Sequence, residues 1–212
     1  NFNFNEQTWK TEILSKRIIA WISNTNLTLE SSNPSYKERF NLCIIKQINH
    51  LFNNINNEKN YENKIINCAA LILTGLTFKE YKKFHIFGLE ILHKFIKINF
   101  DYSGFPKSRN LQELTESFLY LTLIREWIKE SQNLIPEFLD EIIYNLGTSF
   151  YFINENFSQI PLFNGSSQLN NEELKTHLKN SGYLFKYNLN EKGGYYILKH
   201  KKISLIMDIG NS

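Results

Sequence analysis

The chain has 212 residues, of which 42% are hydrophobic and 15% aromatic, so it can bury a sizeable core in one large domain or in one domain and part of another. Only 4 Pro and 9 Gly stand against 17 Phe and 11 Tyr, which argues for packed, regular structure and against disorder. The 24 basic residues are interleaved with 21 acidic ones, and the formal net charge is +3, so the composition indicates no nucleic-acid footprint.

Several local features are assigned ordinary structural roles. The dense basic run at 199–202 is interpreted as a hairpin turn kept in water. Cys43 and Cys68 lie in apolar helical stretches, where a disulfide is possible but not required. No stretch approaches the roughly 18 uninterrupted apolar residues that cross a bilayer, and no targeting signal is seen, so we expect a soluble protein with no transmembrane segment. The chain begins at Asn1 and its methionine is Met207, which indicates a processed chain or a fragment.

Apolar residues recur at a spacing of three to four over most of the first 154 positions, which predicts helices. The predicted helices are 11–24, 35–55, 61–76, 79–99, 108–131 and 136–154, with a polar break at 24–34. The helix at 61–76 is apolar on most of its circumference and is expected in the interior. Because most connections are short, the six helices are most simply three antiparallel hairpins.

Past Asn154 the pattern changes toward turns and strands. A short helix is predicted at 171–179 with Asn170 as a candidate cap. Aromatic and β-branched residues predict strands at 183–188, 195–199 and 203–208, with turns at Gly193-Gly194 and His200-Lys201. A three-stranded meander is a marginal sheet, so we expect further strands to follow. The predicted fold is mainly α, followed by a small antiparallel β segment.

The polar residues most suited to binding stand where a turn containing Gly and Pro opens into the helix at 108–131. They are Lys107, Ser108, Arg109 and Asn110, joined by Asn164 in the later loop. A helix start with free amide N–H groups and an Arg can hold an anion, because the helix dipole and the guanidinium both favour negative charge there. Ser108 is equally an ordinary N-cap of the helix.

Other chemistries find weaker support. The five histidines, His50, His85, His93, His177 and His200, are not spaced as zinc ligands, so neither a metal nor a cofactor is expected. Glu113 and Glu116 lie on successive turns of one helix, where a solvated face is favoured over the paired carboxylates of a hydrolase. The sequence has no Gly-rich phosphate loop, nucleophile elbow or protein-kinase signature.

Several segments, read in order, resemble the heparinase II/III family of polysaccharide lyases, in particular its bacterial members of unassigned substrate. ILSKRIIAWISN, with Trp9 ahead of it, resembles the opening helix of the family's α/α toroid, and NCAALILTGLTF a later helix. SGFPKSRN is similar to the family's Asp-Gly-Gly-His-x-Ser-Arg-Asn turn and PLFNGSS to its Leu-Phe-Asn-Gly-Gly loop. SGYLFKY and LIMDIGN resemble the start of its C-terminal β-sandwich.

The resemblance implies that helical hairpins at 1–156 form part of an α/α toroid, that 157–180 is a connecting loop and short helix, and that 181–212 supplies the first strands of a β-sandwich. It implies β-elimination at a uronic acid of an acidic polysaccharide, in which neutralising the carboxylate allows a Tyr or His base to remove the C5 proton. It also implies a bacterial protein of the periplasm or cytoplasm. The positions that match as substrate-binding residues are Ser108, Arg109, Asn110, Asn164 and Gly165.

The sequence departs from the family at the catalytic positions. Where characterised members carry a Tyr-His pair after the turn, this chain has Glu113 and Leu114, and Pro106 stands where a related subgroup has His. No catalytic residue is therefore assigned. The alternative function is a non-catalytic carbohydrate-binding or cell-envelope scaffold protein that retains the toroid.

Overall fold

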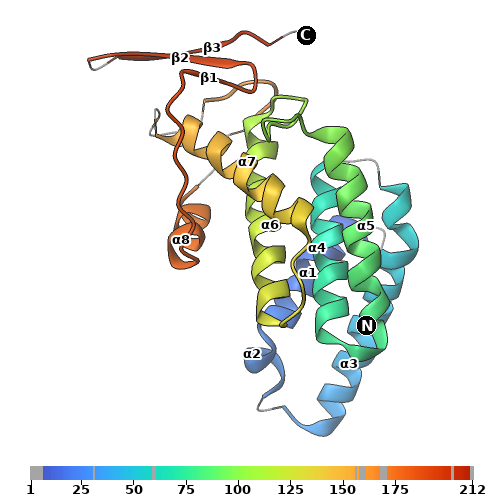
Figure 1. Cartoon of the computed structure of the whole chain (residues 1–212). Coiled ribbons are helices and arrows are strands. Elements are labelled where there is room, and N and C mark those ends of the chain that lie inside the picture. The colour runs from blue at the N-terminus through green and yellow to red at the C-terminus, as the bar shows by residue number, and fades with distance from the viewer. Residues whose placement is uncertain are drawn as a thin grey trace. The chain divides into compact units, whose positions relative to one another are not determined.

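The computed structural model describes residues 7–30, 32–58, 61–155, 157, 161–167, 171–201 and 203–210. Within these ranges the chain forms eight α-helices followed by a three-stranded antiparallel sheet (Figure 1). The prediction of a mainly helical chain with a small antiparallel β segment at its C-terminal end is confirmed. The candidate cap Asn170 lies outside the described residues.

The helices agree with the predicted ones to within a few residues at most ends. They are α1 (Thr11–Ser23), α2 (Thr25–Leu29), α3 (Pro34–Asn54), α4 (Tyr61–Thr77), α5 (Lys82–Asn99), α6 (Leu111–Glu130), α7 (Glu137–Asn154) and α8 (Glu172–Asn180). Two 3-10 turns, η1 (Ile55–Asn57) and η2 (Lys79–Tyr81), precede α4 and α5. The predicted polar break after α1 contains the short helix α2, and the first turn of the helix predicted from residue 79 is the 3-10 turn η2.

The chain divides into two compact units. Unit 1 comprises Asn1–Phe95 and Glu126–Leu134, and unit 2 comprises Ile96–Arg125 and Ile135–Ser212. The helices α5 and α6 therefore each contribute residues to both units. Each unit groups residues that pack together, and the units do not coincide with the domains implied by the resemblance. Those domains stay a prediction.

Unit 1 is built around α4, which packs against α1 and α3. Every residue from Ile65 to Leu73 is buried, as expected for a helix that is apolar on most sides. Ser15 Oγ donates to Asn67 Oδ1 at 2.7 Å, so one polar pair in this core is hydrogen-bonded. Cys68 is buried among these residues, both cysteines are free thiols, and burial raises the pKa of Cys68 to about 12.

The sheet in unit 2 has the order β1 (Glu191–Lys192), β2 (Tyr195–His200) and β3 (Ile203–Asp208). Gly193 and Gly194, with φ of 58° and 79°, make the first turn as predicted, and Lys201, with φ of 53°, lies in the second. Pairing is antiparallel and places Tyr195 opposite Asp208. The predicted strands at 195–199 and 203–208 are confirmed.

The strand predicted at 183–188 is wrong, because this segment makes no ladder. Its Phe185 ring packs edge-on against Phe118 of α6, with centroids 5.6 Å apart. A Cβ on Gly147 of α7 would meet the Phe185 ring at 2.2 Å, so the segment lies directly on the helix there. Packing on helices, rather than pairing with a strand, partly buries Tyr183, Phe185 and Tyr187 and leaves the residues between them exposed.

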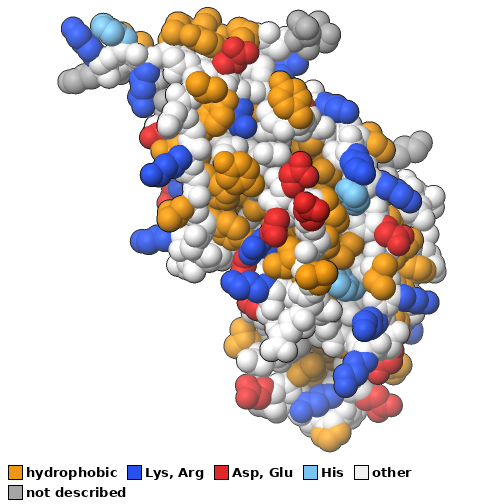
Figure 2. Space-filling view, viewed as in Figure 1, with side chains coloured by type: hydrophobic (Ala, Val, Ile, Leu, Met, Phe, Trp, Pro, Cys, Tyr) orange, Lys and Arg blue, Asp and Glu red, His pale blue; other side chains and the backbone are white. Residues whose placement is uncertain are grey.

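The sheet buries Tyr195 and Ile197 and leaves Leu198, Ile203 and Leu205 exposed. Figure 2 shows hydrophobic side chains over the strands, and charged side chains of both signs interspersed over the face in view. A second sheet would cover such an apolar face, but the β-sandwich stays a prediction. No helix in the described part of the chain is both long and apolar enough to cross a membrane.

Candidate functional site

The turn that precedes α6 is organised by the carboxylate of Asp101. Its Oδ1 accepts hydrogen bonds from Ser103 N, Ser103 Oγ and Phe105 N at 2.8–2.9 Å. Gly104, with φ of 83°, brings the backbone so close to α7 that an added Cβ would meet Asn145 C at 2.5 Å. The turn is therefore fixed on α7 within unit 2.

Asn110, rather than Ser108, caps α6. Its Oδ1 accepts from Gln112 N at 2.8 Å and from Glu113 N at 3.2 Å, which are the bonds of an N-cap. Ser108 Oγ instead bonds to Glu113 Oε2 and accepts from Asn110 N at 3.2 Å. The interpretation of Ser108 as the helix cap is therefore wrong. Ser108 lies beside the cap residue, Asn110.

The helix start does not offer the free amide groups expected of an anion site. Gln112 N and Glu113 N are taken by the cap, and Leu111 N donates to Ser166 Oγ at 3.0 Å. Because these donors are satisfied within the protein, any anion bound here must be held by side chains.

Arg109 reaches across to the last strand. Its Nε lies 3.1 Å from Asp208 Oδ1, with the two side chains 21% and 20% exposed, and its Nη2 lies 3.5 Å from Asp208 Oδ2. Arg109 adopts a left-handed backbone with φ of 55°, which is uncommon for a residue other than Gly. A Cβ on Gly210 would meet the guanidinium at 2.7 Å, so the chain after β3 lies against it.

The loop at 161–167 joins the same corner through Asn164, which also has a left-handed φ of 51°. Asn164 Nδ2 donates to Asp208 Oδ2 and to Tyr195 Oη, each at 2.9 Å. Tyr195 Oη in turn donates to Arg109 O at 2.6 Å. These four residues, Arg109, Asn164, Tyr195 and Asp208, are called the Arg109 cluster below.

All five residues predicted for the site lie at this corner of unit 2. Besides Arg109, Asn164 and the cap Asn110, Ser108 sits beside the cap, and a Cβ on Gly165 would lie 3.7 Å from Asn110 Nδ2. Whether they bind a substrate stays a prediction.

Sequence reasoning missed Tyr195 and Asp208. Both belong to correctly predicted strands, and their role depends on the register that places them opposite each other. The sequence feature that could have indicated them is the glycines beside each residue, Gly193-Gly194 before Tyr195 and Gly210 after Asp208. Glycines at such places mark a close approach of the backbone to other residues.

The protonation states follow from these contacts. Burial works to raise the pKa of Asp208, but hydrogen bonds from Asn164 and Gly210 N and the charge of Arg109 together lower it. Burial raises the pKa of Tyr195 to about 12. Burial also raises the pKa of Glu113, against the Ser108 hydrogen bond and with the help of the Glu116 charge. The cluster therefore holds one cation, one anion and a neutral phenol at pH 7.

No group of three His, Cys, Asp or Glu side chains that could hold a metal is found among the residues that the structure describes. Comparison of the chain with protein-family models, with curated proteins and with solved structures gives no match.

Proposed function

We propose that this chain is part of a heparinase II/III-like bacterial protein that acts on an acidic polysaccharide, by β-elimination at a uronic acid. The observation that supports the proposal is the contact among Arg109, Asn164 and Asp208, which are 55, 44 and 99 residues apart. Each lies in one of the three segments SGFPKSRN, PLFNGSS and LIMDIGN on which the resemblance depends.

The Arg109 cluster is the proposed contact for the sugar carboxylate. The planar guanidinium suits a carboxylate. The amide of Asn164, an exposed residue, lies beside it, but its two N–H groups already donate to Asp208 and Tyr195, so Asn164 can donate to the sugar only by exchanging one of these bonds. Because Asp208 already balances the charge of Arg109, an incoming uronate competes with Asp208. Binding at this corner should therefore be moderate and sensitive to salt.

A lyase needs a side chain that accepts the C5 proton of the sugar, and a protein that only binds the sugar does not. Tyr195 does not suit the role, since its hydroxyl donates to Arg109 O and its pKa is about 12. No histidine belongs to the cluster of described residues. This observation favours, as a second candidate, a carbohydrate-binding or cell-envelope scaffold protein that binds the polysaccharide without cleaving it.

One experiment separates the two functions. The chain, and any longer protein that contains it, is incubated with a panel of uronate polysaccharides while the absorbance of unsaturated uronate is followed and binding is measured in parallel. Growth of absorbance with one polymer supports the lyase. Binding without absorbance supports the scaffold, and neither signal with any polymer contradicts both.

A further inference from the structure

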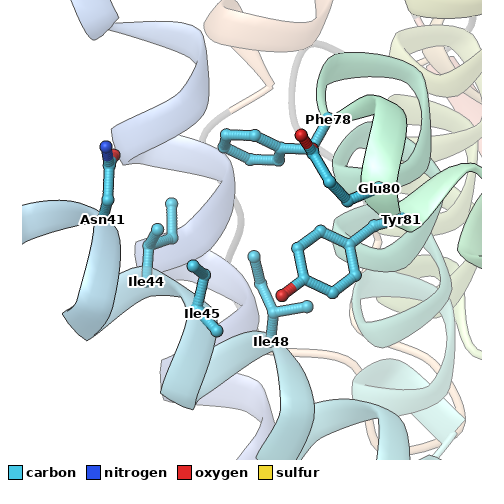
Figure 3. A pocket seen from close by; sticks show the side chains of 7 residues that line it. All are labelled: Asn41, Ile44, Ile45, Ile48, Phe78, Glu80 and Tyr81. Carbon is cyan, nitrogen blue, oxygen red and sulfur yellow. The ribbon is translucent and has the colours of Figure 1, made fainter.

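The short connection between α4 and α5 separates two pockets of unit 1. One pocket, of about 360 Å3, is shown in Figure 3, where three isoleucines of α3 face Phe78 and Tyr81; its lining is Asn41, Ile44, Ile45, Ile48, Phe78, Glu80 and Tyr81. The other pocket, of about 410 Å3, is lined by Gly75, Leu76, Lys79, Lys82, His85 and Asn133. Neighbouring residues of the segment 75–82 thus line different cavities.

The second pocket is positively charged. Lys79 and Lys82 line it, whereas Glu80, the acid between them in sequence, lines the pocket of Figure 3. Among the residues that the structure describes, no carboxylate lines the second pocket. Within the described residues neither ammonium group has an ion-pair partner, so two exposed lysines without a paired carboxylate line this pocket.

His85 also belongs to the lining of this pocket. The residue is 9% exposed, and its Nε2 is buried without a hydrogen-bond partner among the described residues. A Cβ on Gly75 would meet His85 N at 2.2 Å, so the end of α4 packs directly on the first turns of α5 and fixes the His85 backbone. Because this atom is closed off from solvent, a bound anion would meet the charge of the two lysines there and not a hydrogen bond from Nε2.

From these contacts we propose that the pocket lined by Lys79, Lys82 and His85 binds the phosphate group of a small-molecule phosphate monoester. Two ammonium groups match the nearly double charge of such a group at pH 7 better than the single charge of a carboxylate or of a sulfate ester. The volume lies within the range of about 300–1,000 Å3 usual for small-molecule sites, so there is room for more than the oxyanion. This site lies in unit 1 and does not depend on the function proposed for the Arg109 cluster.

The test measures binding of inorganic sulfate, inorganic phosphate and acetate by calorimetry and by the NMR signals of the His85 ring, at constant ionic strength. Sulfate and phosphate should bind saturably and shift the His85 signals, and acetate should bind at least about tenfold more weakly. Lys79→Gln and Lys82→Gln should each weaken sulfate binding by about tenfold, since each removes a charge-assisted contact.

The matched control is Lys83→Gln, which removes the same charge one residue further along α5. The Lys83 ammonium lies over the rings of Phe52 and Phe84 and does not line the pocket. Its loss should leave sulfate binding within about twofold of the parent protein. An equal effect of all three variants, equally tight acetate binding, or no binding of either dianion would overturn the proposal.

A sugar phosphate and a sugar sulfate then test the charge match, because the phosphate monoester carries nearly two negative charges at pH 7 and the sulfate ester carries one. Tighter binding of the sugar phosphate than of both inorganic phosphate and the sugar sulfate supports a small-molecule phosphate site. Weaker binding of the sugar phosphate than of inorganic phosphate, or equally tight binding of the sugar sulfate, would contradict it.

Discussion

The guanidinium of Arg109 and the carboxylate of Asp208 form an ion pair, with Nε and Oδ1 3.1 Å apart, across 99 residues of sequence. Arg109 stands one residue before the cap of α6, and Asp208 ends β3. The ion pair therefore fastens the β segment to the helical part of unit 2. Asn164 bonds to the same carboxylate, so the loop at 161–167 is held by the same contact.

Replacing Asp208→Asn should lower the free energy of unfolding of unit 2 by about 1–2 kcal/mol, because the pair is mostly buried but not fully desolvated. Chemical denaturation followed by circular dichroism measures this change. The control is Asp140→Asn, since Asp140 pairs with Arg125 at 2.6 Å but its side chain is 52% exposed. Its loss should cost no more than about 0.5 kcal/mol, and equal costs for both variants would contradict a special role for Asp208.

The stabilisation by Asp208 should depend on pH. The pKa of this carboxyl is lowered in the folded state, so its contribution is fully present above the unfolded value of about 3.9 and is lost as the pH falls through the folded value. The difference in stability between the parent protein and Asp208→Asn should be constant from about pH 7 to pH 5 and shrink below about pH 4. A difference that persists unchanged at the acid end would count against the ion pair as its source.

Gly193→Ala should destabilise unit 2 strongly. An added Cβ would lie 2.0 Å from the Phe105 ring, and the residue has φ of 58°. Gly182→Ala is the control for the backbone alone, since Gly182 has φ of 74° with nothing within 4 Å of its Cβ position. Gly182→Ala should cost about 1 kcal/mol, and Gly193→Ala about 2 kcal/mol more. Thermal or denaturant unfolding measures the loss of stability in each variant. An equal loss in Gly193→Ala and Gly182→Ala would show that Phe105 does not pack against Gly193.

Tyr195→Phe should cost about 1–2 kcal/mol, because a fully buried hydroxyl that bonds both Asn164 and Arg109 O is removed. Tyr196→Phe, the neighbouring change on the opposite face of the sheet, should stay within about 0.5 kcal/mol. Denaturant midpoints that rank the two variants in the reverse order would show that the Tyr195 hydroxyl does not hold the cluster together.

Periodicity along the chain predicts the long helices, and aromatic and β-branched content predicts two of the strands, whereas the short helix α2 lies in a predicted polar break. The helix α4 is recognisable because it is apolar nearly all round, and β2 and β3 because residues that favour strands lie beside turn residues. The segment 183–188 has a similar composition, yet it packs on α6 and α7 through Phe185. Such a composition indicates that side chains are buried, and it does not report whether the backbone pairs with a strand.

The site was predictable in part for a similar reason. Both Ser108 and Asn110 are good cap residues, and the left-handed backbone of Arg109 between them decides that Asn110 fills the cap. Asp208 and Tyr195 could not be assigned from sequence, because their role comes from the strand register and from contacts with residues far away in the chain.

The most direct test of the proposed function compares the affinity of an acidic oligosaccharide for Arg109→Ala and for Asp208→Asn, at a temperature where circular dichroism shows both variants folded. If Arg109 binds the sugar carboxylate, Arg109→Ala should weaken binding by about tenfold and more at low salt, whereas Asp208→Asn should not weaken it, because it removes the competing carboxylate. Lys107 was a binding candidate from sequence, but its Nζ donates to Ile98 O at 2.6 Å and has no part in the Arg109 cluster. Lys107→Ala therefore controls for general charge and should change affinity less than about twofold. Equal weakening by Arg109→Ala and Asp208→Asn would contradict the account, since it would mean that the pair only holds the corner together.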